Sequence, residues 1–268
     1  MTDVPLLVTD LDGTLWFDGE ACHPRSLEAF TEIQSEGIPI LIATGRRYRI
    51  VASTFARLHW KVPCLLLNGS LCYDFKKNER LFSVSFTEEE NLTILNIFES
   101  HGLSPTIYAD DSFVYANNPT TSRGHLEAIG SDIVKTDDLN VYSLGREVLN
   151  FCILGIPIAD LINVAKDLNE SGLANPSLYE DHLFDGHSLT VQPFNISKWS
   201  GILQWCEHNE FTPSRVIAVG DAGNDIEMLT HADISVVVAG AEQRLLDLAD
   251  HVIPSPSTGG WADVINLL

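Results

Sequence analysis

The chain has 268 residues, of which 45% are hydrophobic and 20% charged, with a formal net charge of −21 and a pI near 4.6. This length accommodates one large domain or two modest ones with a sizeable core. Because such an acidic surface repels nucleic acids and anionic membranes, we expect neither as a partner.

Cysteine usage and hydropathy point to a cytoplasmic protein. The five cysteines show no C-x-x-C spacing, and most lie beside apolar residues, which is typical of reduced, packed thiols. No segment approaches the roughly 18 consecutive apolar residues that a membrane helix requires. The N-terminal segment contains Asp3 and has no basic stretch before an apolar run, so we expect no secretory signal.

Strands and helices alternate over the first 70 residues. Apolar runs predict strands over 5–9, 38–43 and 62–67. An amphipathic pattern predicts one helix from His23-Pro24 to Gly37 and another over 46–58. Strands separated by helices of this length indicate βαβ units and a parallel sheet.

The pattern changes between about residue 71 and residue 191. Alternation over 73–86 and over 106–116 predicts two hairpins, and Thr87 with Glu90 has the spacing of a capping box at the start of a helix ending at Gly102. We then expect a strand over 147–154, a helix over 159–171, and strands over 177–184 and 187–191. Clustered hairpins with interspersed helices predict an antiparallel α+β domain.

The α/β pattern returns after Pro193. We expect helices over 197–208, 241–249 and 261–268, and strands over 215–219, 234–238 and 250–253. The sequence therefore predicts an α/β core formed by residues 1–84 and 192–268, with residues 85–191 inserted as a second domain.

Polar segments follow three of the predicted parallel strands, and a lone lysine begins a predicted helix. The candidate residues lie in Asp10-Leu11-Asp12-Gly13-Thr14, Thr44-Gly45-Arg46, Lys198, and Gly220-Asp221-Ala222-Gly223-Asn224-Asp225. Parallel strands end at a common carboxyl edge, where ligands bind in such sheets. We therefore expect these side chains to converge on one crevice.

This set of side chains suits the transfer of a phosphoryl group. A carboxylate can attack phosphorus as a nucleophile, and a second carboxylate two residues away can act as general acid and base. Magnesium binds few protein carboxylates and completes its shell with water and phosphate oxygens. We expect Asp10, with Asp221 or Asp225, to hold such an ion, which would offset the charge repulsion between nucleophile and phosphate.

Taken singly, each segment has an ordinary structural explanation. The first resembles the start of an EF-hand calcium loop, but Leu15 and Ala21 occupy the positions of the required glycine and glutamate. Thr44-Gly45 is also typical of a turn at a strand end, and Lys198 of a solvated helix residue. The order of all the segments together favours an active site.

On these motifs, the chain resembles haloacid dehalogenase-like (HAD) superfamily phosphatases of the Cof-type group with a type IIB cap. The first segment matches the family's Asp-x-Asp-x-Thr signature, and Ala43-Thr44-Gly45-Arg46 matches its second motif. Ile196-Ser197-Lys198 matches the third, and residues 220–229 match the fourth. The resemblance implies a Rossmann-like parallel-sheet core with an inserted α+β cap.

The resemblance also implies roles for the candidate residues. Asp10 would be the nucleophile and a magnesium ligand, and Asp12 the general acid and base, lending its backbone carbonyl to the metal. Asp221 would be the third metal ligand, with Asp225 supporting the metal shell or Lys198. The residues expected to bind the phosphate or substrate are Thr44, Gly45, Arg46, Asn68, Lys198 and Asn224.

Two positions depart from the family pattern. Trp199 stands where a glycine follows the lysine in most members, and we interpret it as packing on the core together with Leu203 and Cys206. The second motif continues with Arg47 and Arg49, which we interpret as solvated helix charges.

These observations predict a magnesium-dependent phosphomonoesterase acting on a small phosphorylated metabolite through a phospho-aspartate. The polar segment 181–187 either reaches the crevice or forms a surface turn, and its Asp-Gly favours the turn. Residues 256–263 resemble a Gly-Trp segment of mannosyl-3-phosphoglycerate phosphatases, which favours a sugar phosphate. A phosphosugar mutase and a non-catalytic phosphometabolite sensor remain alternatives. A dehalogenase is disfavoured, because those enzymes use no metal and usually lack the second carboxylate. The sequence does not indicate an oligomeric state.

Overall fold

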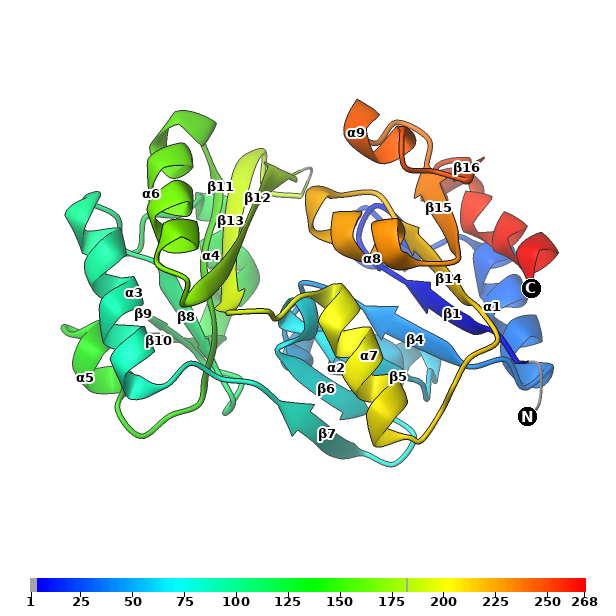
Figure 1. The fold of residues 1–268 in the computed structure, drawn as a ribbon, viewed down its shortest axis with the longest axis horizontal. Helices are drawn as coiled ribbons and strands as arrows, with labels where there is room; N and C mark the ends of the chain where they lie inside the picture. Colours follow the sequence, from blue (N-terminus) through cyan, green and yellow to red (C-terminus); the bar gives the residue numbers. More distant parts are fainter. Residues whose placement is uncertain (1–3, 182) are drawn as a thin grey trace.

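The structure, a computed structural model, describes residues 4–181 and 183–268 and contains two α/β lobes built on separate sheets (Figure 1). The first lobe, called the core, has an eight-stranded sheet in the order β16-β15-β14-β1-β4-β5-β6-β7. Neighbouring strands from β16 to β5 are parallel, and β6 and β7 are antiparallel additions. Its strands are β1 (Leu6–Thr9), β4 (Ile40–Ala43), β5 (Pro63–Leu66), β6 (Leu71–Asp74), β7 (Glu79–Ser83), β14 (Val216–Gly220), β15 (Ile234–Val238) and β16 (His251–Ile253).

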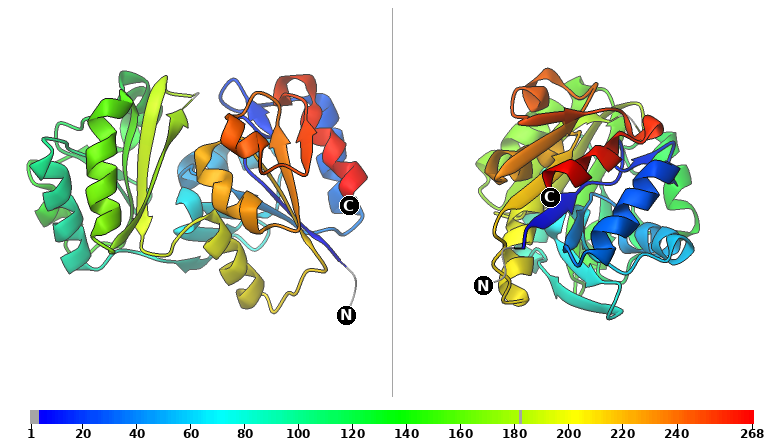
Figure 2. Two further views of the ribbon diagram at one scale, coloured as in Figure 1. Left: turned by 45° about the horizontal axis from the view of Figure 1, so that its top comes forward. Right: turned by 90° about the vertical axis from the view of Figure 1, so that its right-hand side faces the viewer.

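Helices cover both faces of the core sheet (Figure 2). One face packs against α1 (Pro24–Ser35), α2 (Tyr48–Leu58) and a C-terminal 3-10 helix (Gly260–Leu267). The other face packs against α7 (Lys198–His208), α8 (Ile226–His231) and α9 (Gln243–Leu246). Strands β4 and β14 contain only apolar residues and glycine, and β1 only one polar residue, Thr9, because both faces of these central strands are buried, as in other parallel sheets.

The second lobe, called the cap, has a six-stranded sheet in the order β10-β9-β8-β11-β13-β12. Its strands are β8 (Thr106–Ala109), β9 (Val114–Ala116), β10 (Ile133–Lys135), β11 (Val148–Ile156), β12 (Ala174–Asp181) and β13 (Gly186–Pro193). Helices α3 (Glu88–Ser100) and α6 (Ile158–Glu170) cover the sheet face that points away from the core (Figure 1). Thr87 caps α3 through the expected capping box.

Side chains along β11 alternate between the hydrophobic core of the cap and the cavity between the lobes. Phe151 and Ile153 pack beneath α3 and α6, whereas Asn150, Cys152 and Leu154 line a cavity between the lobes. The fold class predicted from the sequence, a parallel α/β core with an α+β insert, is confirmed. The predicted domain limits, 1–84, 85–191 and 192–268, stay a prediction; β13 continues to Pro193.

Several short elements were not expected from the sequence. Residues 117–146 contain α4 (Arg123–Ile129), β10 and α5 (Leu139–Ser143), and a small hairpin of β2 (Trp16–Phe17) and β3 (Ala21–Cys22) follows β1. Elements of two to seven residues are too short to show a periodic pattern. None of the helices in the described part of the chain is long and apolar enough to cross a membrane.

The packing of α7 corrects one expectation. Trp199 packs on the core beside α8, where its ring stacks on His231 at 5.5 Å between centroids. Leu203 does not share this burial, because 53% of it is exposed. The fully covered side of α7 instead carries Ile202 and Trp205.

Candidate active site

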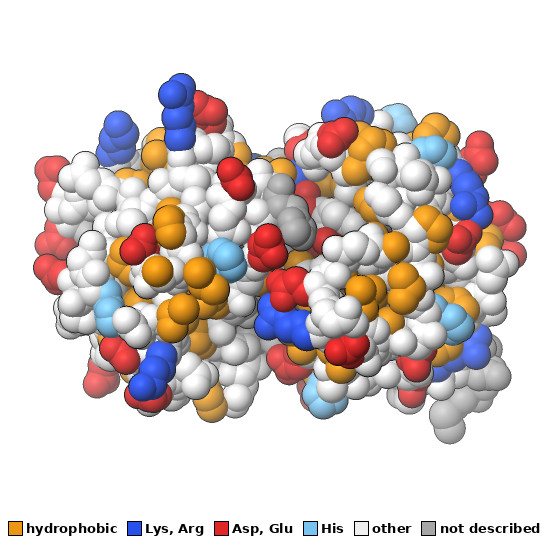
Figure 3. Space-filling view, turned by 90° about the horizontal axis from the view of Figure 1, so that it is seen from above, with side chains coloured by type: hydrophobic (Ala, Val, Ile, Leu, Met, Phe, Trp, Pro, Cys, Tyr) orange, Lys and Arg blue, Asp and Glu red, His pale blue; other side chains and the backbone are white. Residues whose placement is uncertain are grey.

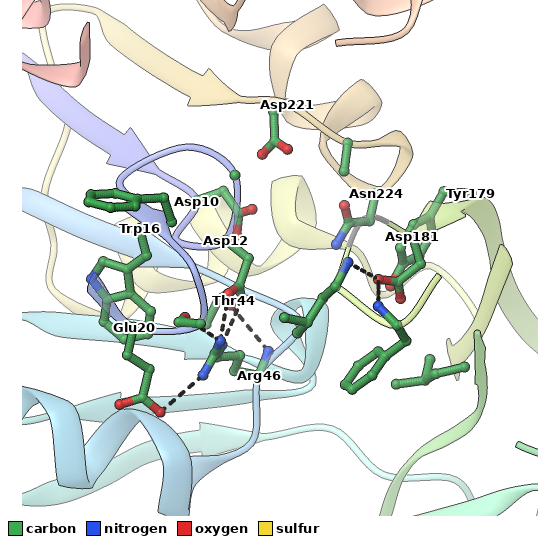
Figure 4. Close-up of a pocket in the computed structure, with 18 of the residues that line it drawn as sticks. Asp10, Asp12, Trp16, Glu20, Thr44, Arg46, Tyr179, Asp181, Asp221 and Asn224 are labelled. Atoms are coloured by element: carbon green, nitrogen blue, oxygen red, sulfur yellow. Dashed lines mark hydrogen bonds and ion pairs between the residues drawn. The ribbon is translucent and has the colours of Figure 1, made fainter. Parts of the chain in front are cut away.

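Three adjacent strands bring the predicted residues to one edge of the core sheet. Asp10 follows β1, Thr44 follows β4, and Asp221 follows β14, and these strands are neighbours in the order β14-β1-β4. In Figure 4 the side chains of these residues and of Asp12 face the same space. This space is a cavity of about 800 Å³ between the core and the cap.

Lys198 reaches this edge from the first turn of α7. Its ammonium nitrogen, Nζ, lies 2.8 Å from Oδ1 of Asp10 and 2.6 Å from Oδ1 of Asp225, and its side chain is completely buried. Burial disfavours the lysine's charge, but the two carboxylates outweigh this effect and raise the pKa of Lys198 above its usual range. Lys198 is therefore a fixed positive charge next to Asp10.

Three buried carboxylates meet beside this lysine. Oxygens of Asp10, Asp221 and Asp225 all lie within 4.8 Å of one another. Burial raises the pKa of Asp10 to about 7, with Lys198 opposing and the nearby carboxylates adding to this shift. Burial and the charge of Asp10 also raise the pKa of Asp221 well above its usual range. One lysine does not balance this negative charge, so the donor set fits a divalent cation bound by carboxylate oxygens.

Asp221 and Asp225 have different hydrogen-bond partners, which indicate different roles in the site. Oδ2 of Asp225 accepts hydrogen bonds from the backbone N–H groups of Asp221 and Ala222, while its Oδ1 accepts from Lys198, so both of its oxygens are occupied. Oδ1 of Asp221 accepts a 2.6 Å hydrogen bond from the Thr14 hydroxyl. Asp225 is thus placed to support the site, and Asp221 to contribute a metal ligand.

Because Gly13 has no side chain, the carboxylate of Asp221 can lie directly against it. A Cβ atom at this position would lie 2.1 Å from Oδ2 of Asp221, and the φ angle of +74° is one that glycine adopts without strain. The glycine of the first motif therefore allows the two acidic segments to approach each other.

Asp12 is held by Arg46. The Nε and Nη2 atoms of Arg46 each donate a 2.6 Å hydrogen bond to the Asp12 carboxylate, and Nη1 lies 3.3 Å from Glu20 (Figure 4). The guanidinium also lies over the ring of Trp16 in the small β2–β3 hairpin, 5.2 Å from its centroid. Sequence analysis predicted Arg46 as a phosphate or substrate ligand and missed its bidentate contact with Asp12.

Of the remaining predicted residues, Thr44, Gly45 and Asn224 line the cavity, and Asn68 is buried beside them. The buried Thr44 accepts the backbone N–H of Arg46, and Gly45 lies next to Asn68, whose Oδ1 would be 3.2 Å from a Cβ there. The amide of Asn68 accepts a hydrogen bond from Asn224 at 3.0 Å and donates one to Thr190 of the cap at 3.1 Å. Asn68 therefore connects the two lobes inside the site.

The cap supplies residues that sequence analysis did not identify. Tyr108, His125, Asn150 and Phe184 line its side of the cavity. The predicted turn at 181–187 does join β12 to β13, but Asp181, Leu183 and Phe184 also line the cavity; His182 lies outside the described residues. The polar residue Asn150 within the otherwise apolar strand β11 was the available signal.

The interpretation as a solvated helix charge fits Arg49, which is an exposed residue of α2, but it is wrong for Arg47. Arg47 is 6% exposed, and its guanidinium pairs with Asp132 of the cap at 2.5 Å and donates to the carbonyl of Ile129. Arg49 lies 3.3 Å from the same aspartate and over the ring of Phe113. The error arose because the cap segment that pairs with Arg47 is distant in sequence.

The match to a known family covers nearly the whole chain. A sequence model described as haloacid dehalogenase-like hydrolase matches residues 7–265. The chain belongs to this family. The resemblance inferred from the motifs is thereby confirmed, and so is the expected enzyme class, a phosphatase of this family, since named phosphatases are among its relatives.

Two phosphatases are similar to the chain over nearly its whole length. The chain is 23% identical to the pyridoxal phosphate phosphatase YbhA of Escherichia coli, over 97% of each protein. It is 25% identical to a phosphoglycolate phosphatase of Methanopyrus kandleri, over 98% of this chain and 96% of the relative.

Solved structures share the fold of nearly the whole chain. A haloacid dehalogenase-like hydrolase from B. subtilis superposes with a TM-score of 0.84 at 18% identity, covering 98% of this chain and 99% of that one. The HAD subclass IIB sugar phosphatase BT4131 superposes with a TM-score of 0.78 at 21% identity, covering 98% of each chain.

Proposed function

We propose that this haloacid dehalogenase-like hydrolase is a magnesium-dependent phosphomonoesterase that works through a phospho-Asp10 intermediate. The observation that carries the proposal is the arrangement around Asp10. Its carboxylate lies beside the buried ammonium of Lys198 and within reach of the Asp221 carboxylate, with Asp12 facing the same cavity. A nucleophile, an acid and a fixed positive charge are the groups that transfer of a phosphoryl group to a carboxylate requires.

In the first step an oxygen of Asp10 attacks phosphorus, and the bond to the ester oxygen breaks while Asp12 gives that oxygen a proton. In the second step Asp12 takes a proton from water, whose oxygen attacks phosphorus, so that inorganic phosphate leaves and Asp10 is restored. Lys198 fixes Oδ1 of Asp10 and faces the negative charge on the transferring group. Arg46 keeps the Asp12 carboxylate oriented toward the cavity.

Asp10, Asp221 and the backbone carbonyl of Asp12 would hold a magnesium ion, with Asp225 supporting the arrangement through Lys198 and two backbone N–H groups. A bound magnesium ion supplies charge neutralisation, which lets an anionic carboxylate approach an anionic phosphate. Thr44, Gly45 and Asn224 are proposed to contact the phosphate, since they line the cavity next to Asp10.

The proposed substrate is a small phosphorylated metabolite of the cytoplasm, with sugar phosphates as the expected class. The cavity volume of about 800 Å³ suits a molecule of this size. The likeness to a sugar phosphatase structure supports the class. Of the segment 256–263, Pro256 and Ser257 line the cavity, whereas its Gly-Trp part does not. Trp261 is completely buried and donates to Thr9, so this part of the tail packs the core.

The test is phosphate release from a panel of phosphorylated metabolites and p-nitrophenyl phosphate, with magnesium and with a chelator. Release that requires magnesium and is lost in Asp10→Asn supports the proposal. Release that is unchanged by the chelator or by the substitution would contradict it. Isomerisation of a sugar phosphate faster than phosphate release would instead identify a mutase, and tight binding without any turnover a sensor.

A further inference from the structure

Among the described residues, two arginines line the cavity, and both are already paired with carboxylates. Arg46 makes two hydrogen bonds to Asp12 and lies 3.3 Å from Glu20. Arg47 is paired with Asp132 at 2.5 Å, and this pair lies where core and cap meet. Lys198 lies behind Asp10 with its charge shared between Asp10 and Asp225. None of these three cations is free to receive a second anionic group of a substrate.

Acidic side chains line the part of the cavity beyond Asp10. Asp18 belongs to the β2–β3 hairpin of the core, and Glu180 and Asp181 end strand β12 of the cap, so they approach the cavity from both lobes. In Figure 3 acidic groups, together with a basic group beside them, lie along the seam between the two lobes. Within the described residues, these three carboxylates have no lysine, arginine or histidine partner.

Asp181 is fixed in place by its own turn. Its Oδ1 accepts the backbone N–H groups of Leu183 and Phe184 (Figure 4). Its Oδ2 accepts the hydroxyl of Ser188. These hydrogen bonds hold the Asp181 carboxylate at a defined position beside the cavity.

The other cap residues at the cavity are uncharged. Tyr108 accepts or donates a 2.6 Å hydrogen bond at Nε2 of His125, and burial lowers the pKa of His125 to about 4, so this imidazole is neutral near pH 7. Asn150, Thr190 and the ring of Phe184 complete this surface. Such a surface can receive hydroxyl groups and apolar faces, but the cap residues that the structure describes here offer no positive charge near pH 7.

We propose that the site selects phosphate monoesters whose leaving group is uncharged or cationic, and rejects those that carry a second anionic group. The phosphate itself is received by Lys198 and the proposed cation. A carboxylate or second phosphate on the leaving group would instead lie among the charges of Asp18, Glu180 and Asp181. This inference rests on the proposed phosphatase function and narrows its substrate class.

The test compares matched pairs of esters that differ in charge far from the phosphate. One pair is glucitol 6-phosphate and 6-phosphogluconate, which are both open chains, and a second is glycerol 3-phosphate and 3-phosphoglycerate. Glucosamine 6-phosphate adds a positive charge to the pyranose framework of glucose 6-phosphate. Assays at about pH 7 and low salt keep most ordinary histidines neutral, keep the amine of glucosamine 6-phosphate mostly protonated and limit screening. For an ester that is turned over too slowly, its inhibition constant against p-nitrophenyl phosphate replaces kcat/KM.

We expect each acid to have a kcat/KM at least about tenfold below its uncharged partner, or an inhibition constant weaker by that factor. Glucosamine 6-phosphate should match or exceed glucose 6-phosphate. In the double variant E180Q/D181N, the ratio of kcat/KM (or of inhibition constants) between neutral and acidic esters should fall several-fold. Its asparagine keeps an oxygen for the two backbone N–H groups of the turn, and unchanged thermal melting would confirm folding.

Glu127→Gln is the matched control, because it removes one negative charge from an exposed cap position that does not line the cavity. It should leave the preference unchanged. Equal use of acids and neutral esters, or an unchanged gap in the double variant, would overturn the inference while the phosphatase function stands. No phosphate release from any ester, p-nitrophenyl phosphate included, would overturn the proposed function itself.

Discussion

Arg47 of the core and Asp132 of the cap form an ion pair in which one Nη atom lies 2.5 Å from a carboxylate oxygen. The arginine precedes α2, directly after the Thr44-Gly45-Arg46 motif, and the aspartate lies between α4 and β10. Side-chain exposure is only 7% for the arginine and 17% for the aspartate. The pair therefore connects the cap to the core next to the residues that we propose contact the substrate.

We expect Arg47→Ala to destabilise the protein by about 2–3 kcal/mol, because it leaves a largely buried carboxylate without its main partner. Urea unfolding measures this loss, and a raised KM would show that the cap is held less firmly. Arg49→Ala is the matched control, since this arginine is 43% exposed and should contribute less than about 1 kcal/mol. Equal losses for the two variants would contradict the assignment.

Thr14→Val should weaken magnesium binding without unfolding the protein. The hydroxyl of Thr14 donates to Oδ1 of Asp221, and valine keeps its shape but cannot donate. Loss of a group that orients a metal ligand typically costs about 10–100-fold in metal affinity or activity. The magnesium concentration for half-maximal phosphate release should rise accordingly, whereas an unchanged magnesium dependence would show that Thr14 does not position Asp221.

Lys198→Ala should lower kcat by roughly 10²–10³, since one preorganised charge next to the transferring group is lost. Steady-state phosphate release with saturating magnesium measures this effect. Lys166→Ala provides the comparison, because that lysine is 67% exposed on the outer cap helix α6 and pairs only loosely with Glu170 at 3.7 Å. A loss of similar size in both variants would mean that the effect is not local to Asp10.

Acidification should destabilise the cap through His125. Burial, with a smaller contribution from Arg47, lowers its pKa from 6.5 to about 4 in the folded protein. Between these values the unfolded chain binds a proton that the folded chain does not, so stability falls as the pH drops from about 6.5 to 4. Integrated over that range, the loss is about 3 kcal/mol.

His125→Gln should remove this pH dependence. Urea unfolding of the variant from pH 7.5 to 4 should give a flatter stability profile than the unchanged protein, although both lose stability through other groups. If the free energy of unfolding falls by the same amount in both proteins between pH 7.5 and 4, His125 is not the group that titrates.

The residues predicted from the sequence were those whose position follows from local rules. Asp10, Thr44 and Asp221 follow apolar strands, and the carboxyl ends of parallel strands meet at one edge. Lys198 could be placed because a Ser197 cap marks the start of α7. Predictions of this kind need only the strand pattern and the order of elements.

The contacts that escaped prediction depend on pairing between distant segments. The Arg46–Asp12 and Arg47–Asp132 pairs join residues 34 and 85 positions apart, and the charge of an arginine does not reveal its partner. Leu203 was placed in the core from helical spacing, but the stripe of α7 that is covered lies one position away, at Ile202. The cap face of the cavity could not be predicted, because it depends on how the two lobes meet.

The central claim is that Asp10 carries the phosphoryl group during turnover. The most direct measurement is acid quenching of the magnesium-loaded enzyme during turnover of a radiolabelled phosphomonoester, followed by peptide mapping. The mechanism predicts label on the peptide that contains Asp10, dependent on magnesium and absent from Asp10→Asn, which should also release no phosphate. Phosphate release by Asp10→Asn at the rate of the unchanged protein would contradict the claim.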